Sequence, residues 1–162
     1  AARGWRLLLP EGTAPDAPAH PAIRRVPFLP QRDWDRLLWS CGLNLVRGED
    51  SLVRALWAGR PMLWQAYRQP ERAERPKLAA FADRWLGDDA ALPAPAARAF
   101  EAAQDAWNLA PDPAADAAMR LAAPALLDAL PALDAHAERV RGRLGGFPDA
   151  VSRLVSFAVG RL

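Results

Sequence analysis

Hydrophobic and polar positions follow two alternating patterns in the first half of the chain. Short apolar runs predict buried strands, and segments in which apolar residues recur every three or four positions predict amphipathic helices. The expected strands are residues 5–9, 23–28, 43–46 and 61–65, and the expected helices are 33–41, 50–58 and 71–86. Strands that alternate with helices are typical of a parallel sheet with helical crossovers, so we expect an α/β fold with a Rossmann-like parallel sheet.

The pattern changes after Gly87, where apolar residues keep only the helical spacing. We expect four helices in this region, at residues 96–108, 114–130 and 132–144 and after Pro148. The chain therefore divides into a Rossmann-like part at residues 1–86, a polar connector at 87–95, and a helical part at 96–162 that completes the same lobe.

Composition and charge exclude several classes of function. Of the 162 residues 51% are hydrophobic, which predicts a folded core. The net charge of +2 is too small to indicate a nucleic acid or an anionic membrane as partner. Nearly all basic residues are arginine, with Lys77 as the single lysine, which we interpret as a genome-composition bias. The single cysteine, Cys41, and the lack of a visible secretory signal predict a cytoplasmic protein.

The strand expected at 43–46 leads directly into the turn Arg47–Ser51 and then into a helix. Ligands of open α/β sheets bind at the carboxyl ends of the strands, and a helix N-terminus favours anions. The Arg47 guanidinium suits phosphate oxygens, Gly48 lets the backbone approach a ligand closely, and Ser51 adds a hydroxyl. The turn therefore predicts a site for a phosphate-bearing ligand.

Two groups of residues near this turn each have two interpretations. Glu49 and Asp50 repel a diphosphate, so they either accept hydrogen bonds from sugar hydroxyls or simply cap the helix. Phe28 and Trp34 flank Gln31, so they either sandwich a nucleobase that Gln31 reads or belong to the core. Residue type and spacing alone favour the structural interpretation in both cases.

A metal site is not expected. Asp33 and Asp35 form a D-x-D triplet, but it opens a helix, where the two carboxylates lie about 200° apart around the axis. His20 and His136 have no second ligand at a metal-binding spacing.

Together these segments resemble one family, the protein-arginine rhamnosyltransferases that modify bacterial translation elongation factor P. The resemblance is carried by P-F-L-P-Q at 27–31, D-W-D-R-L-L-W-S-C at 33–41 and L-N-L-V-R-G-E-D-S at 43–51, and it continues to Tyr67. The family resembles two-lobed GT-B glycosyltransferases, and this chain is similar to the lobe that binds the donor, dTDP-β-L-rhamnose. The resemblance implies an inverting transfer of rhamnose to an arginine side chain of elongation factor P, without a metal or other cofactor.

The resemblance also implies roles for the residues of the turn. Arg47 and Ser51 hold the diphosphate beside Gly48, and Glu49 and Asp50 contact the ribose or the rhamnose and support catalysis.

Upstream of the turn, the resemblance implies that Phe28 and Trp34 flank the thymine while Gln31 contacts its polar edge. Trp34 stands where the family is expected to have Phe or Tyr, so stacking is kept in a wider pocket.

Nothing in the chain matches the family's N-terminal half, whose aspartates are proposed to assist the acceptor arginine. We therefore expect this fragment to bind the donor and to be inactive by itself. Two alternatives stay open: a non-catalytic module that docks a partner protein on its helical part, and another nucleotide-sugar transferase with the same half-fold.

Overall fold

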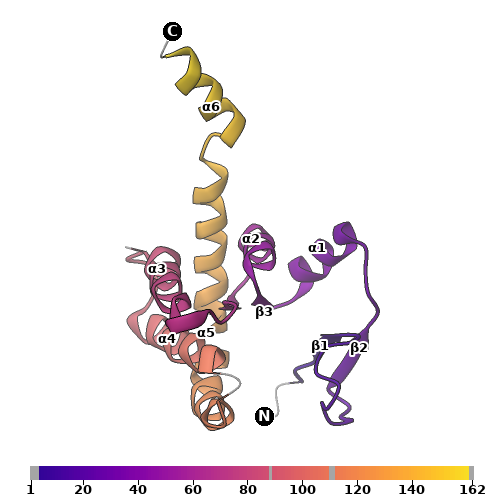
Figure 1. The fold of residues 1–162 in the computed structure, drawn as a ribbon. Helices are drawn as coiled ribbons and strands as arrows, with labels where there is room; N and C mark the ends of the chain where they lie inside the picture. The colour runs from indigo at the N-terminus through magenta and orange to yellow at the C-terminus, as the bar shows by residue number, and fades with distance from the viewer. Residues whose placement is uncertain (1–3, 88, 110–111, 161–162) are drawn as a thin grey trace. The chain divides into compact units, whose positions relative to one another are not determined.

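A computed structural model describes residues 4–87, 89–109 and 112–160 (Figure 1). Its contacts divide the chain into two compact units, Ala1–Arg36 and Leu37–Leu162. Each unit is described by itself below. The division expected around residues 87–95 stays a prediction.

The first unit contains a pair of parallel strands, β1 (Leu7–Pro10) and β2 (Ile23–Val26). The loop between them is held by the Arg25 guanidinium, which donates to the carbonyl oxygens of Thr13 and Ala14. Helix α1 (Gln31–Ser40) begins in this unit and ends in the second. The two strands predicted here are confirmed, although both are shorter than expected.

The described residues of the second unit form a second parallel pair and five further α-helices. Its elements are β3 (Asn44–Arg47), α2 (Glu49–Ala58), β4 (Met62–Gln65), the short 3-10 helix η1 (Pro70–Arg72), α3 (Glu74–Leu86), α4 (Ala94–Leu109), α5 (Ala114–Gly145) and α6 (Ala150–Val159). The α/β class with parallel strands is confirmed. A single Rossmann-like sheet is not what the structure shows: in the described parts of the chain the strands form two separate two-stranded sheets, in the orders β1-β2 and β3-β4.

The β3–β4 sheet ends at β4 because α4 occupies its open edge. The Gln104 side-chain amide accepts a hydrogen bond from the Trp64 backbone N–H (3.0 Å) and donates one to the Trp64 carbonyl oxygen (2.6 Å). Asn108 donates to the same carbonyl (2.9 Å) and accepts from the Ala66 N–H (3.3 Å). These two amides satisfy the Trp64 N–H and carbonyl and the Ala66 N–H, which a neighbouring strand would otherwise bond, and so block the addition of a strand at this end of the edge.

Helix α5 corrects a sequence prediction, because residues 114–145 form one helix where two were expected. Pro124 and Pro131 lie inside it, and each removes a backbone donor at a cost of about 3 kcal/mol in a helix interior. The helix continues because its inner face is buried, including Leu126, Leu130 and Leu133, and it packs along α4. Tertiary packing here overrides a strong local signal.

The core of the second unit lies between the β3–β4 sheet and the helices α3, α4 and α5. Phe100 is 1% exposed and stacks on Trp85 at a ring-centroid distance of 4.2 Å. Met62 and Leu63 bring the buried strand β4 into the same core.

A buried charged cluster joins the connector after α3 to α5. His136 is fully buried, with Nδ1 2.6 Å from Asp89 Oδ2 and Nε2 2.7 Å from the Trp85 carbonyl oxygen. Both ring nitrogens of His136 thus lie within hydrogen-bonding distance of an oxygen. Arg139 Nε also donates to Asp89 Oδ2 at 2.9 Å. The hydrogen bond from His136, together with Arg139, lowers the pKa of Asp89 to about 2 although burial opposes the shift.

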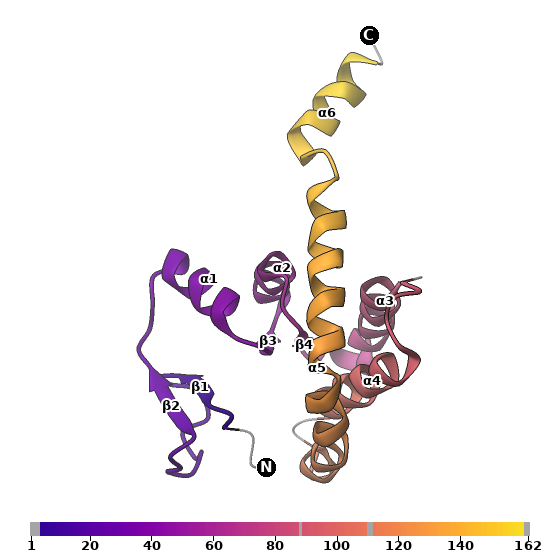
Figure 2. The same ribbon diagram turned by 180° about the vertical axis from the view of Figure 1, so that it is seen from behind.

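The last helix, α6, follows α5 (Figure 2) and keeps its apolar side chains in solvent. The exposed side chains include Val151, Leu154, Val155, Phe157 and Val159. Among the helices that the structure describes, none is long and apolar enough to cross a membrane.

Substitution of Gln104 tests the closure of the sheet edge. Gln104→Ala leaves the buried Trp64 N–H without its partner, so we expect the free energy of unfolding to fall by about 1–3 kcal/mol. Urea unfolding followed by circular dichroism measures the change. The control is Glu101→Ala on the exposed side of α4, expected to change stability by less than about 0.5 kcal/mol. Equal effects in the two variants would contradict the role of Gln104.

Acid unfolding tests the Asp89 cluster. Because the pKa of Asp89 is about 2 in the folded chain against an ordinary 3.8, its carboxylate stabilises the fold above about pH 4, and this contribution disappears as the pH falls toward 2. We therefore expect Asp89→Asn to be less stable than the parent near pH 6, and the difference in melting temperature to shrink between pH 4 and pH 2. A difference that stays constant over this range would contradict the assignment.

Candidate functional site

The candidate site begins at the carboxyl end of β3. Along this strand Asn44 and Val46 point inward, while Leu45 and Arg47 are exposed. The buried Asn44 side chain donates to the Leu38 carbonyl oxygen at 3.1 Å and so ties the start of β3 to the end of α1. The alternation of the strand therefore presents the Arg47 guanidinium at the surface, where the chain turns into α2.

Gly48 forms the turn between β3 and α2. Its φ of 80° lies in the region that favours glycine, and its N–H donates to the Gln65 carbonyl oxygen at 3.0 Å. The Gly48 carbonyl oxygen accepts from the Leu52 N–H (3.1 Å) and from Trp64 Nε1 (3.0 Å). No side chain caps this end of α2, so the N–H groups of its first turn have no side-chain capping partner. Such a helix start is suited to a bound anion.

Tyr67 covers this turn from the end of β4. Its ring centroid lies 5.0 Å from the Arg47 guanidinium carbon, a cation–π arrangement. A Cβ placed on Gly48 would lie only 2.7 Å from Tyr67 Cε2 and 3.0 Å from the Tyr67 hydroxyl oxygen. The bare glycine is what lets the phenol lie this close to the backbone, and the phenol in turn restricts Arg47.

The two carboxylates at the start of α2 have different partners. Asp50 Oδ2 accepts a hydrogen bond from Arg54 Nε at 2.9 Å, one turn along the same helix. Glu49 Oε1 lies 3.8 Å from the Lys77 ammonium nitrogen on α3, within ion-pair range but beyond hydrogen-bonding distance. Ser51 follows, half-buried, in the same turn. Five of the eight predicted site residues, 47–51, therefore share one turn.

The other three predicted site residues belong to the first unit. Phe28 lies just before α1 and is 93% exposed, so its expected alternative as a core residue is wrong. Gln31 is the first residue of α1 and is exposed, and Trp34 lies one turn further on and is half-buried. A pocket formed jointly by these residues and the turn at 47–51 stays a prediction.

The D-x-D triplet lies in α1 as expected. Asp33 pairs with Arg36 of its own helix, with Arg36 Nη1 3.0 Å from Asp33 Oδ1. Within the ranges that the structure describes, no group of three or more His, Cys, Asp and Glu side chains is placed to hold a metal ion.

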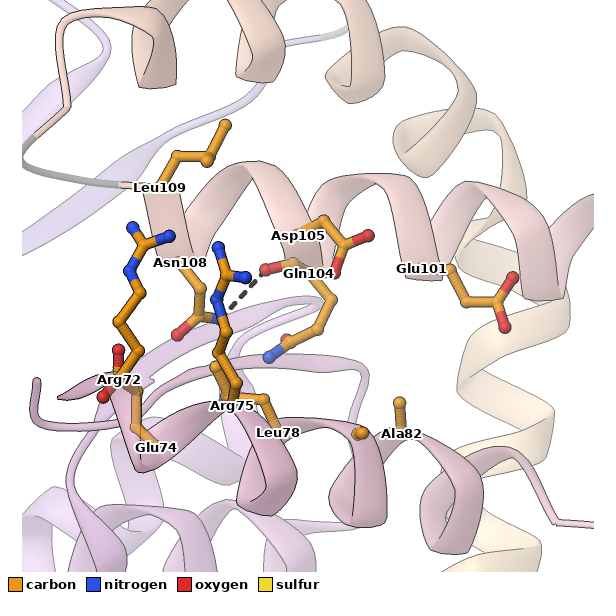
Figure 3. Close-up of a pocket in the computed structure, with 11 residues that line it drawn as sticks. Arg72, Glu74, Arg75, Leu78, Ala82, Glu101, Gln104, Asp105, Asn108 and Leu109 are labelled. Carbon is orange, nitrogen blue, oxygen red and sulfur yellow. Dashed lines mark hydrogen bonds between the residues drawn. The ribbon is translucent and has the colours of Figure 1, made fainter. Parts of the chain in front are cut away.

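A separate hollow of about 600 Å³ lies between α3 and α4 (Figure 3). Arg72 and Arg75 line one wall, and Glu101 and Asp105 line the wall formed by α4. None of residues 47–51 is among its lining residues. Its lining carries two arginines and, with Glu74, three carboxylates, so no single sign of charge dominates, and the hollow carries no functional assignment.

The fold and the turn together define an α/β protein with an arginine beside an uncapped strand–helix junction, and comparisons with known proteins show its family. Residues 15–159 match the family model of elongation factor P rhamnosyltransferase, EarP. The chain belongs to this family.

Individual relatives agree with the family. A protein-arginine rhamnosyltransferase of Pseudomonas aeruginosa is 43% identical over 135 residues, which cover 83% of this chain and 34% of that protein. The Pseudomonas putida protein of the same name is 42% identical over 138 residues and is covered to 33%. The chain thus spans about a third of the length of these relatives.

A solved structure gives the corresponding fold. It comes from work on the structural basis for EarP-mediated arginine glycosylation of translation elongation factor EF-P. The match has a TM-score of 0.73 at 34% sequence identity and covers 100% of this chain and 54% of that one.

Two residues at the turn were not predicted from the sequence. They are Tyr67, which only marked the end of the stretch of resemblance, and Lys77, which was noted only as the single lysine. Both carried one signal that could have marked them, since each is the single residue of its type in the chain.

Substitution of Gly48 tests the geometry of the turn. Gly48→Ala combines a positive φ with a clash against the Tyr67 ring, so we expect the free energy of unfolding to fall by about 1–3 kcal/mol. The control is Gly142→Ala inside α5, where a Cβ meets nothing within 4 Å and a gain of about 0.5–1 kcal/mol is expected. A neutral Gly48→Ala variant in the same unfolding experiment would show that the turn is built differently.

Proposed function

We propose that this chain is the donor-binding half of an inverting GT-B glycosyltransferase that transfers rhamnose from dTDP-β-L-rhamnose to an arginine side chain of elongation factor P. The observation that carries the proposal is the Arg47 guanidinium beside Gly48 and the uncapped start of α2, in a chain of the EarP family. The names of the relatives support arginine rhamnosylation, and elongation factor P appears in the description of the structural match.

In the proposed reaction, the turn stabilises the leaving group. Displacement of a nucleoside diphosphate builds negative charge on its phosphate oxygens. A guanidinium and a helix start aimed at this charge stabilise it without a metal ion. The helix contributes about 0.3–1 kcal/mol at an exposed position, so Arg47 carries the larger share.

Tyr67 preorganises the Arg47 side chain before the ligand binds. Its ring lies against the Arg47 guanidinium and limits the rotamers of a long side chain that otherwise loses entropy on binding. The exposed phenol hydroxyl lies beside Gly48 and can also donate to a phosphate oxygen. Tyr67 is therefore included in the proposed diphosphate site.

The carboxylates of Glu49 and Asp50 are assigned a role other than binding the phosphates. A protonated guanidinium has no free lone pair for attack, so the acceptor arginine must be oriented and must lose a proton. We assign sugar contacts and support of catalysis to Glu49 and Asp50, and the main carboxylates for the acceptor to the part of the relatives that this chain does not span. The chain by itself then binds donor and turns over poorly or not at all.

The thymine of the donor is assigned to the first unit. Phe28 exposes its ring almost completely, and Gln31 stands exposed at the start of α1. With Trp34 one turn further on, these side chains supply two aromatic faces and an amide for the base. The exposure of Phe28 favours this role over core packing.

A role of the helical part in docking a partner protein is the second candidate. It is favoured by α6, which exposes large apolar side chains by 54–70%: Val151, Leu154, Val155, Phe157 and Val159. This role does not compete with donor binding at the turn, because the two use different elements.

Calorimetry with dTDP tests the proposed function. We expect binding to the chain, a loss of about tenfold or more in affinity for Arg47→Ala, and a smaller loss for Phe28→Ala, because a charged contact to phosphate contributes more than one stacking face. UDP and GDP should compete less well than dTDP. Absence of heat and of a thermal shift at millimolar dTDP, or the opposite order of the two variants, would reject the site.

A further inference from the structure

Lys77 is the one basic residue of the chain that is not an arginine, among 21 basic residues. It lies on α3, and its ammonium nitrogen is 3.8 Å from Glu49 Oε1 at the start of α2. The side chains are 48% and 61% exposed, so neither charge has been removed from water. The single lysine therefore meets one of the two carboxylates at the proposed donor site.

The Lys77–Glu49 distance distinguishes this ion pair from the pair that Asp50 forms with Arg54. Arg54 hydrogen-bonds Asp50 directly at 2.9 Å and so occupies one of its oxygens. At 3.8 Å the Lys77 ammonium attracts Glu49 without a direct hydrogen bond. Glu49 is thus drawn to one side of the turn while its oxygens keep their capacity to accept hydrogen bonds from a ligand.

The chemistry of the two cations explains why lysine suits this position. Arginine presents a planar fork that binds both oxygens of a carboxylate at once, whereas lysine is a compact point charge. A fork at position 77 would hold Glu49 in a bidentate pair and compete with any hydroxyl of the ligand. An ammonium can hold the carboxylate by charge alone.

Stability does not account for the pair. An exposed ion pair contributes little to folding, and this ionic contact joins two different helices at the edge of the proposed site. A substitution of Lys77 is therefore expected to leave folding almost unchanged, which allows effects on the ligand to be measured separately.

We propose that Lys77 is a positioning residue of the donor site, which holds Glu49 so that its carboxylate accepts hydrogen bonds from the sugar hydroxyls of the nucleotide sugar. The inference rests on the proposed function, because it assumes that Glu49 contacts the ligand. It assigns no contact between Lys77 and the ligand itself.

A double-mutant cycle on ligand affinity tests this assignment. The affinity of the 162-residue chain for dTDP-rhamnose is measured by calorimetry for the parent, Lys77→Met, Glu49→Gln and the double variant. We expect Lys77→Met to weaken binding about three- to tenfold in the parent and to have no further effect in the Glu49→Gln background. Lys77→Arg should also weaken binding, because its fork engages the Glu49 oxygens.

The matched control is Arg141→Met. Arg141 forms an ion pair with Glu138 on α5 with side-chain exposures of 45% and 58%, close to those of Lys77 and Glu49. This substitution should leave the affinity unchanged, and melting temperatures of all variants show whether folding is affected.

Each outcome has a defined meaning. Additive losses from Lys77→Met and Glu49→Gln would overturn the proposal by showing that Lys77 contacts the ligand independently. Parent affinity in Lys77→Met or in Lys77→Arg would overturn it as well. Arg47→Ala separates the proposed donor site from the proposed role of Lys77. If Arg47→Ala weakens binding while Lys77→Met does not, only the role of Lys77 fails. If neither the parent chain nor any variant binds dTDP-rhamnose, the proposed function itself fails and this inference with it.

Discussion

The closure of the β4 edge by two side-chain amides is the interaction on which the second unit depends. Gln104 and Asn108 bond the backbone of Trp64 and Ala66, so a helix stands where a further strand would pair. This fixes α4 against the sheet, and α5 packs along α4. It also fixes β4, whose Trp64 indole N–H and Gln65 carbonyl oxygen hold Gly48. The position of the turn is therefore set from the helical part of the chain.

The local spacing of apolar residues predicted the helices and strands better than it predicted how they are arranged. The order of strands and helices up to α4 was predicted from apolar spacing, because each segment carries its own periodicity. Two features could not be predicted in that way. The structure describes two separate strand pairs in place of one sheet, and the β4 edge is closed by a pair of amides about forty residues later in the chain. The break expected in α5 was wrong because packing against α4 outweighs Pro124 and Pro131.

In the candidate site, too, contiguous residues were predicted and contacts from distant elements were not. Residues 47–51 were predicted together because they are contiguous and follow a strand. Tyr67 and Lys77 reach the turn from other elements, and no spacing rule connects them to it. Composition did contain a signal, since residue types that are rare in this arginine- and alanine-rich chain stand at positions with specific contacts. Its two asparagines, Asn44 and Asn108, both bond backbone groups through their amides.

The separation in sequence between β4 and its covering helix has a consequence for synthesis. When residues 44–65 have left the ribosome, the backbone of Trp64 still lacks Gln104 and Asn108, which follow 40 and 44 positions later. Until then the strand pair has an unpaired border that other extended chains can join. Maturation of the turn at 47–51 is thus tied to translation of α4, and a ribosome that stalls before this helix leaves a nascent chain with an incomplete sheet.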